Sequence, residues 1–166
     1  MTLEEFEAIY YGKRVDFNGQ DVGQCVDLVQ LYNRDVVKAP RLVGNAKDLA
    51  NNTQPAFYDY IKNTLFYIPP KGSIAVWNDK VGGGYGHTAI VISANVITFV
   101  ALGQNWPIGS GVHRETHNYK HIDGFLVPKK QPLFLDGVGA AEAIEEYQKR
   151  ARTVIQNAIN TLNTLM

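Results

Sequence analysis

The fold is decided by Gly86–Ser93, with the sequence GHTAIVIS. Its unbroken Ala-Ile-Val-Ile run predicts a strand buried on both faces, with a histidine at its start. A second strand is expected over Ser73–Trp77, directly after the turn-forming residues 69–72 (PPKG). Further strands are expected over 96–101 and 124–127. Together these segments predict an antiparallel sheet.

Working back toward the N-terminus, the apolar spacing changes to that of helices. Short helices are expected over 3–12 and 46–51, and a longer one over 24–37, with Pro40 just beyond its end. The aromatic stretch 55–63 gives no clear prediction. Helices followed by an antiparallel sheet are typical of an α+β domain.

Composition excludes several classes of function. The 166 residues are 45% hydrophobic, enough for one globular domain with its own core. Sixteen basic and sixteen acidic residues balance, so no net charge attracts nucleic acid. No run of eighteen apolar residues predicts a membrane span. Residues 1–6 are acidic and do not resemble a secretory signal.

Cys25 is the only cysteine, and it stands in the sequence GQCVDLVQ at 23–30. A glycine before it and an apolar helical run after it place the sulfur on the first turn of a helix. Free N–H groups and the helix dipole favour a thiolate there. A lone cysteine forms no internal disulfide, so Cys25 is either an inert core residue or a nucleophile.

A nucleophilic cysteine needs a base, and His87 is the best-placed histidine because it opens a buried strand after a glycine-rich loop. His113, His117 and His121 lie in a polar stretch and are expected to be solvated. A zinc site there is disfavoured because a fourth ligand is missing. Asn105 can accept the imidazole N–H of His87, with Trp106 screening that bond from water.

Four motifs in order resemble the CHAP domain: GQCVDL (23–28), GSIAVW (72–77), GHTAIV (86–91) and QNW (104–106). CHAP domains are cysteine- and histidine-dependent amidohydrolases or peptidases with a papain-like fold, found in phage endolysins and bacterial wall hydrolases. The resemblance covers about residues 1 to 130. It implies that the protein cleaves an amide bond of peptidoglycan, as an N-acetylmuramoyl-L-alanine amidase or an endopeptidase.

The resemblance also implies roles for residues. Cys25 is the nucleophile, and it forms a thiolate–imidazolium ion pair with His87, the base. The Cys25 N–H and the Gln24 side chain hold the oxyanion. Many relatives carry an acidic residue where this chain has Gly103, so either Asn105 orients His87 alone or the third member comes from elsewhere.

We expect two aromatic residues, Trp106 and Tyr85, to bind substrate. For Trp106, a place in the core is the alternative reading.

A calcium loop is expected beside the cysteine, over residues 16–27. Its oxygen ligands follow the spacing of an EF-hand loop: Asp16, Asn18, Gln20, the Val22 carbonyl and Asp27. The loop departs from that pattern in having an aspartate at the last place and a glycine at the fourth. Some CHAP endolysins resemble it and bind calcium there. The alternative is an aspartate-rich loop that caps the following helix.

The leading hypothesis is therefore an endolysin acting on the peptidoglycan of a Gram-positive host. Without a signal peptide, we expect it to stay in the host cytoplasm until a holin pore releases it to the wall. Two alternatives remain: a calcium-dependent wall-binding module with a silent Cys25, and a secreted or tail-associated cysteine amidase effector.

The domain boundaries are expected to be a CHAP domain over 1–130, a linker over 131–139 and a helix over 140–166. The helix carries a narrow apolar seam of coiled-coil type, formed by Ile144, Tyr147, Ala151, Val154, Ala158, Leu162 and Leu165. It can dock on the domain, join two copies or lead to a wall-binding domain.

Overall fold

The computed structural model describes residues 1–20, 23–51, 54–130 and 156. The chain divides into two compact units, Met1–Phe134 and Leu135–Met166. In the second unit only Gln156 is described, and it is helical. The linker expected over 131–139 and the helix expected over 140–166 otherwise lie outside the described residues.

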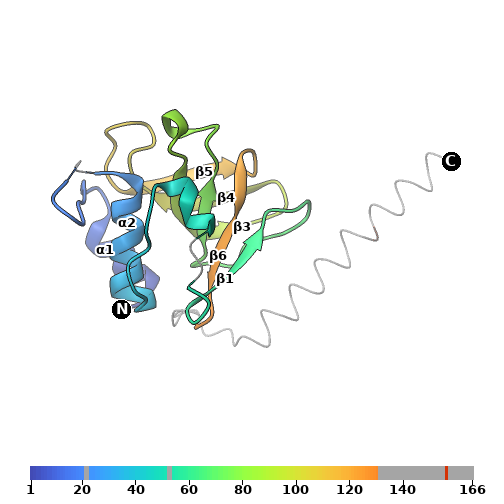
Figure 1. Ribbon diagram of the computed structural model, residues 1–166, viewed down its shortest axis with the longest axis horizontal. Helices are drawn as coiled ribbons and strands as arrows, with labels where there is room; N and C mark the ends of the chain where they lie inside the picture. Colours follow the sequence, from blue (N-terminus) through green and yellow to red (C-terminus); the bar gives the residue numbers. More distant parts are fainter. Residues whose placement is uncertain (21–22, 52–53, 131–155, 157–166) are drawn as a thin grey trace. The chain divides into compact units, whose positions relative to one another are not determined.

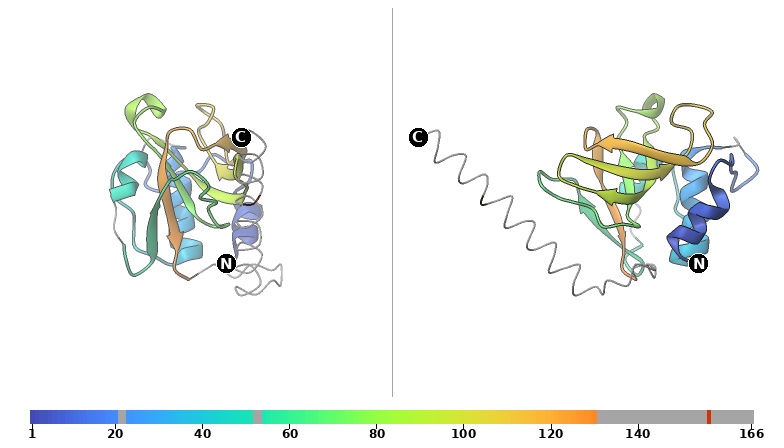
Figure 2. Two further views of the ribbon diagram at one scale, coloured as in Figure 1. Left: turned by 90° about the vertical axis from the view of Figure 1, so that its right-hand side faces the viewer. Right: turned by 180° about the vertical axis from the view of Figure 1, so that it is seen from behind.

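Two helices open the first unit and lie side by side (Figures 1 and 2). Helix α1 (Leu3–Tyr10) begins with a capping box in which the Thr2 hydroxyl accepts from Glu5 N, and the Glu5 carboxylate accepts from Thr2 N. Helix α2 (Cys25–Tyr32) continues into the π-helical turn η1 (Asn33–Val37), so the predicted helix is present in two parts. A 3₁₀ segment, η2 (Ala46–Asn51), matches the third predicted helix.

Six strands form one sheet in the order β1-β6-β2-β3-β4-β5, and every neighbouring pair is antiparallel. The strands are β1 (Tyr58–Lys62), β2 (Ile74–Trp77), β3 (His87–Ala94), β4 (Thr98–Gly103), β5 (His113–Asn118) and β6 (Ile122–Pro128). The α+β class and the antiparallel sheet are confirmed. Strand β1 comes from the aromatic stretch without a clear prediction, and β5 was not predicted at all.

The sheet buries both of its faces. On one face, apolar residues of β2, β3, β4 and β6 pack against α1 and α2. On the other, Trp77, Ala89, Val91, Phe99 and Phe125 form a second cluster. Three consecutive residues of β3, Ala89 to Val91, are fully buried. This confirms the prediction of a strand covered on both sides.

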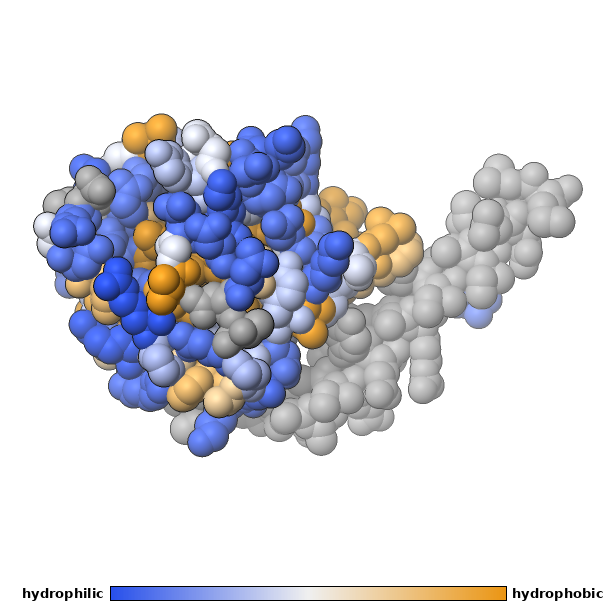
Figure 3. Space-filling model, in the orientation of Figure 1, coloured by the Kyte–Doolittle hydropathy of each residue, from blue (hydrophilic) through white to orange (hydrophobic). Residues whose placement is uncertain are grey.

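The face of the described unit in Figure 3 is mainly hydrophilic, with apolar residues in small groups. Among the described helices, none has both the length and the apolar character that crossing a bilayer requires.

A tight turn before β3 sets the position of His87. Gly86 has φ +80°, and a Cβ built on it would lie 2.5 Å from the Trp77 carbonyl oxygen and 2.7 Å from Lys47 N. Lys47 N also donates to the Tyr85 carbonyl at 3.1 Å, which holds η2 against this turn. Both the backbone conformation and the lack of space therefore require glycine.

We expect Gly86→Ala to lower the free energy of unfolding by about 2–4 kcal/mol, because left-handed strain adds to a backbone clash. Gly82→Ala is the matched control. Gly82 has φ +61° with nothing within 4 Å of its Cβ position, so only strain of about 1–2 kcal/mol is expected. Urea denaturation measures both, and equal losses would contradict the steric argument.

Candidate active site

Cys25 is the first residue of α2 and lies where that helix meets the start of β3. Its thiol accepts from the backbone N–H of Thr88, the residue after His87. The helix start is fixed by Asp27, whose carboxylate accepts from Gln24 N at 2.9 Å. Cys25 remains partly exposed. The two residues predicted to react are therefore brought to the same junction.

A buried glutamine ties this junction together. The Gln104 side chain is fully buried at the end of β4. Its Nε2 donates to the Val15 carbonyl at 2.9 Å and to the Gln24 carbonyl at 2.7 Å, while its Oε1 accepts from Val15 N at 3.0 Å. Gln104 thus holds both the loop before α2 and the residue before Cys25 against the sheet.

Burial affects the pKa of the Cys25 thiol more than its position at the helix N-terminus does. Desolvation raises the pKa of Cys25 to about 11, although N–H groups of Thr88, Val26 and Cys25 itself lower it. At neutral pH Cys25 is a thiol. The resting thiolate expected from the helix position is therefore not found.

His87 is 3% exposed and is surrounded by aromatic rings. Its ring centroid lies 5.1 Å from that of Trp77, directly across from it on β2, and 4.9 Å from that of Trp106. Burial lowers the pKa of His87 below its ordinary value, although the charge of Glu115 raises it. His87 is therefore neutral at pH 7 and able to accept a proton.

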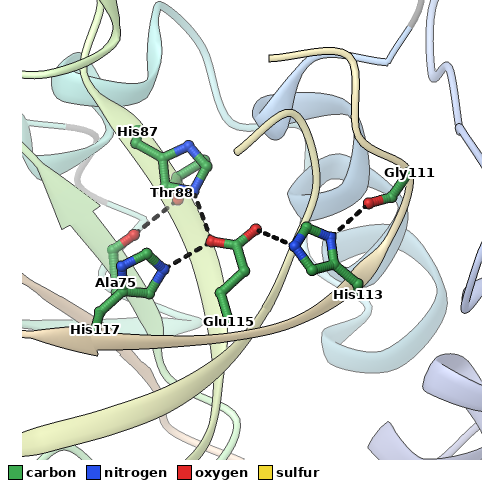
Figure 4. A network of polar contacts seen from close by, with 7 residues as sticks. All are labelled: Ala75, His87, Thr88, Gly111, His113, Glu115 and His117. Atoms are coloured by element: carbon green, nitrogen blue, oxygen red, sulfur yellow. Dashed lines mark hydrogen bonds and ion pairs between the residues drawn. The ribbon is translucent and has the colours of Figure 1, made fainter. Parts of the chain in front are cut away.

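The carboxylate of Glu115, on β5, faces this imidazole (Figure 4). Its Oε2 lies 3.6 Å from His87 Nε2 and accepts from His117 Nε2 at 2.7 Å. Its other oxygen, Oε1, lies 3.9 Å from His113 Nε2, and the second ring nitrogen of His113 donates to the Gly111 carbonyl at 2.8 Å. Three imidazoles thus surround one buried carboxylate.

Glu115 is ionised in this setting. Burial would raise its pKa, but the contacts from His117 and His87 outweigh that effect, so the pKa of Glu115 is lowered. A negative charge is therefore held beside the ring of His87.

Comparison with known proteins identifies the family of this chain. A family model described as the CHAP domain matches residues 15–105, more than half of the chain. The chain belongs to the CHAP domain family. The match contains Cys25, His87 and Gln104 but ends before Glu115.

Two phage proteins show the same similarity. Endolysin PlyTW of Staphylococcus phage Twort is 32% identical over 141 residues, which are 76% of this chain and 30% of that protein. Endolysin LysK of Staphylococcus phage K is 33% identical over 94 residues, which are 55% of this chain and 19% of that protein. The chain thus spans less than a third of the length of either endolysin.

A solved structure shows that the similarity includes the fold. The crystal structure of the wild-type endolysin LysIME-EF1 aligns with a TM-score of 0.64 at 25% identity, over 90% of this chain and 83% of that one. The structure of Ly7917 shares the fold at a TM-score of 0.59 and 18% identity.

Within this CHAP domain, Asn105 does not occupy the place beside His87 that the sequence suggested. Its Nδ2 donates to Gln24 Oε1 at 3.1 Å, and its Oδ1 accepts from Gly109 N at 2.7 Å. Both ends of the Asn105 side chain are thus engaged away from the imidazole. The carboxylate that faces His87 is Glu115, which the sequence analysis did not find.

The remaining residues considered in the sequence differ in how far they are buried. Trp106 is half-buried against His87, which fits a screening role. Tyr85 is 65% exposed at the rim before β3. The expectation that His117 is solvated is wrong, because it packs 4.8 Å from Trp77 by ring centroids and only 10% of its side chain is exposed. Substrate binding by the two aromatic residues stays a prediction.

His87, Glu115 and His117 could hold a metal by donor type, since their ligand atoms lie within 4.8 Å of one another. Tetrahedral zinc with bonds of 2.0–2.1 Å requires ligand atoms only about 3.3 Å apart. The observed spacing is uneven: Glu115 Oε2 lies 3.6 Å from His87 Nε2 but only 2.7 Å from His117 Nε2, from which it already accepts a hydrogen bond. We therefore interpret them as a polar network around the imidazole.

The predicted calcium loop is partly described. Asp16 Oδ1 accepts from Asn18 N at 3.0 Å and Gly19 N at 2.8 Å, and Asn18 Oδ1 accepts from Gln20 N at 2.9 Å. Asp27 is buried at the start of α2. Val22 lies outside the described residues. The donors are hard oxygens on a tightly turned loop, and they suit Ca²⁺ chemically.

The raised pKa of Cys25 predicts its reaction with iodoacetamide. Because only the thiolate reacts, we expect the alkylation rate to rise steadily from pH 7 to pH 10. Mass spectrometry follows the single cysteine, and glutathione provides the control reaction. A rate that is already maximal at pH 7 would contradict the neutral thiol.

Proposed function

We propose that this CHAP domain is a peptidoglycan hydrolase that cleaves an amide bond through Cys25 and His87. The observation that carries the proposal is the junction of α2 and β3, where the single cysteine and a buried neutral histidine meet. Similarity to two staphylococcal phage endolysins supports the wall of a Gram-positive host as the substrate.

The first chemical step follows from the protonation states. His87 Nε2 faces Glu115, so Nδ1 is the ring nitrogen that takes the proton of the Cys25 thiol. The sulfur attacks the amide carbonyl carbon as the proton leaves. The carbon–oxygen double bond becomes a single bond to an oxyanion, and His87 becomes an imidazolium.

Gln24 is suited to hold that oxyanion. Gln24 Oε1 accepts a hydrogen bond from Asn105 Nδ2. This bond orients the Gln24 amide group so that its Nε2 remains a donor. The backbone N–H of Cys25, in the first turn of α2, is the second donor. Asn105 therefore supports the site by orienting Gln24.

The second step releases the amine. When the oxyanion collapses, the carbon–nitrogen bond breaks and His87 gives its proton to the leaving nitrogen. The product is a thioester on Cys25. Water, deprotonated by His87, attacks the thioester and restores the thiol. The bond can be the one between muramic acid and L-alanine or one within the peptides.

We propose further that Ca²⁺ binds the loop before Cys25, held by Asp16, Asn18, Gln20, the Val22 carbonyl and Asp27. The ion would supply positive charge that keeps the carboxylates of this loop together. Asp27 lies two residues after Cys25 and fixes the helix start. Ordering of the loop would therefore order the turn that presents the thiol.

The hydrolase is tested with Cys25→Ala and His87→Ala on purified staphylococcal walls. Each variant should lower the rate of wall clearing at least about 1,000-fold while unfolding like the parent, since each removes a reacting group. His121→Asn is the control, because it removes a histidine from the turn between β5 and β6 and asparagine tolerates its φ of +64°.

Mass spectrometry of the digest identifies the bond that is cut. A Cys25→Ala protein that still clears walls would disprove the assignment of the nucleophile. Binding to walls without cleavage by any form would favour the alternative of a wall-binding module.

Calcium is tested by thermal unfolding of the full chain in chelator and in millimolar Ca²⁺. At 100 times the Kd, bound Ca²⁺ should add about 2.7 kcal/mol to the free energy of unfolding. Asp16→Asn should lose this gain, whereas Asp79→Asn, in an exposed loop after β2, should keep it. An unchanged melting temperature and unchanged activity after exhaustive chelation would disprove the site.

A further inference from the structure

We propose that Glu115 is the positioning residue for His87, and that β5 supplies it in place of a side chain on β4. The inference rests on the proposed function, because it names the group that prepares His87 to act as the base. It begins from the 3.6 Å contact between Glu115 Oε2 and His87 Nε2, in which both side chains are at least 95% buried.

Position 103 shows why the carboxylate comes from β5. Gly103 pairs with His113, two residues before Glu115. A Cβ built on Gly103 would lie 2.6 Å from Glu115 Oε1 and 3.0 Å from Glu115 Cδ. The φ of Gly103 does not require glycine, so the requirement is for space. The Glu115 carboxyl group occupies the volume that a side chain at 103 would fill.

Glu115 is itself held in place. His117 Nε2 lies 2.7 Å from the oxygen that faces His87, and the His117 ring packs on Trp77 and Phe99. The carboxylate therefore cannot turn away without breaking a hydrogen bond in a buried setting. A fixed acceptor beside Nε2 favours the tautomer with its proton on Nε2 and the lone pair on Nδ1.

The contact is also suited to the charged intermediate. In the neutral state His87 Nε2 has no hydrogen-bond partner in the described part of the chain, and 3.6 Å is slightly long for one. When His87 takes the proton of Cys25, the imidazolium attracts the carboxylate. A short motion then completes the bond, and the intermediate is stabilised more than the resting state.

The main test is Glu115→Gln, which keeps the shape and removes the charge. The titratable groups facing His87 are Cys25 from α2 and Glu115 and His117 from β5. Because the carboxylate raises the pKa of His87, its loss should move the titration of the His87 ring, followed by NMR, to lower pH. The acid limb of kcat/KM should move the same way, with kcat about 100-fold lower and KM within about twofold.

Glu7→Gln is the matched control. Glu7 binds Arg114 at the surface, and Arg114 is the residue directly before Glu115 in the sequence. It should change neither the titration of His87 nor kcat. The titration needs no activity, so it still tests Glu115 if the chain fails to cleave walls. An unmoved His87 titration, or a kcat within threefold of the parent, would overturn the proposal.

Relocation of the carboxylate gives the sharpest test. Gly103→Glu alone should lose activity, because two carboxyl groups compete for one space. Glu115→Ala should lose it as well. The double variant Gly103→Glu/Glu115→Ala should regain at least tenfold over Glu115→Ala, because the charge returns beside His87 from β4. A double variant no more active than Glu115→Ala would overturn the proposal.

Discussion

The start of α2 is held against the start of β3, and the chemistry of the site depends on that contact. It brings the Cys25 thiol to the Thr88 N–H, beside His87. Helix and strand belong to separate parts of the chain, and Gln104, directly after β4, further ties the loop before α2 and Gln24 to the sheet. Gln104 makes three hydrogen bonds in a buried setting. There, each polar group left without its partner costs about 1–3 kcal/mol of stability. Gln104 therefore helps to fix the position of the residue before Cys25 relative to the sheet that carries His87.

Close packing at this junction also affects the protonation states of Cys25 and His87. A rise in the pKa of Cys25 from 9.0 to about 11 corresponds to about 3 kcal/mol against the thiolate. A helix N-terminus at a surface contributes about 0.3–1 kcal/mol in its favour. Desolvation therefore prevails, and it also lowers the pKa of His87. Burial therefore favours the uncharged form of both residues.

Apolar patterns predicted most of this fold. Hydrophobic residues on the buried faces were enough to predict three elements: strand β2, strand β3 and the helix that begins at Cys25. Strand β5 reads HRETHN and has no apolar residue. Its side chains on the buried face are His113, Glu115 and His117, so the pattern of a half-buried strand is present with titratable groups in place of apolar ones. Strand β5 and the Glu115 carboxylate were therefore missed for the same reason, the absence of apolar residues from this strand.

The close approach of the Glu115 carboxyl group to Gly103 shows why the position of this carboxylate in the sequence is hard to foresee. Strands β4 and β5 are neighbours, so a carboxylate can reach the same point beside His87 from either strand. What the imidazole requires is a negative charge at one place on the sheet face, and that requirement does not fix a position in the sequence. The family match ends at residue 105, ten positions before Glu115. A glycine at 103 therefore does not mean that the charge is lost, because the space it leaves is filled by the next strand.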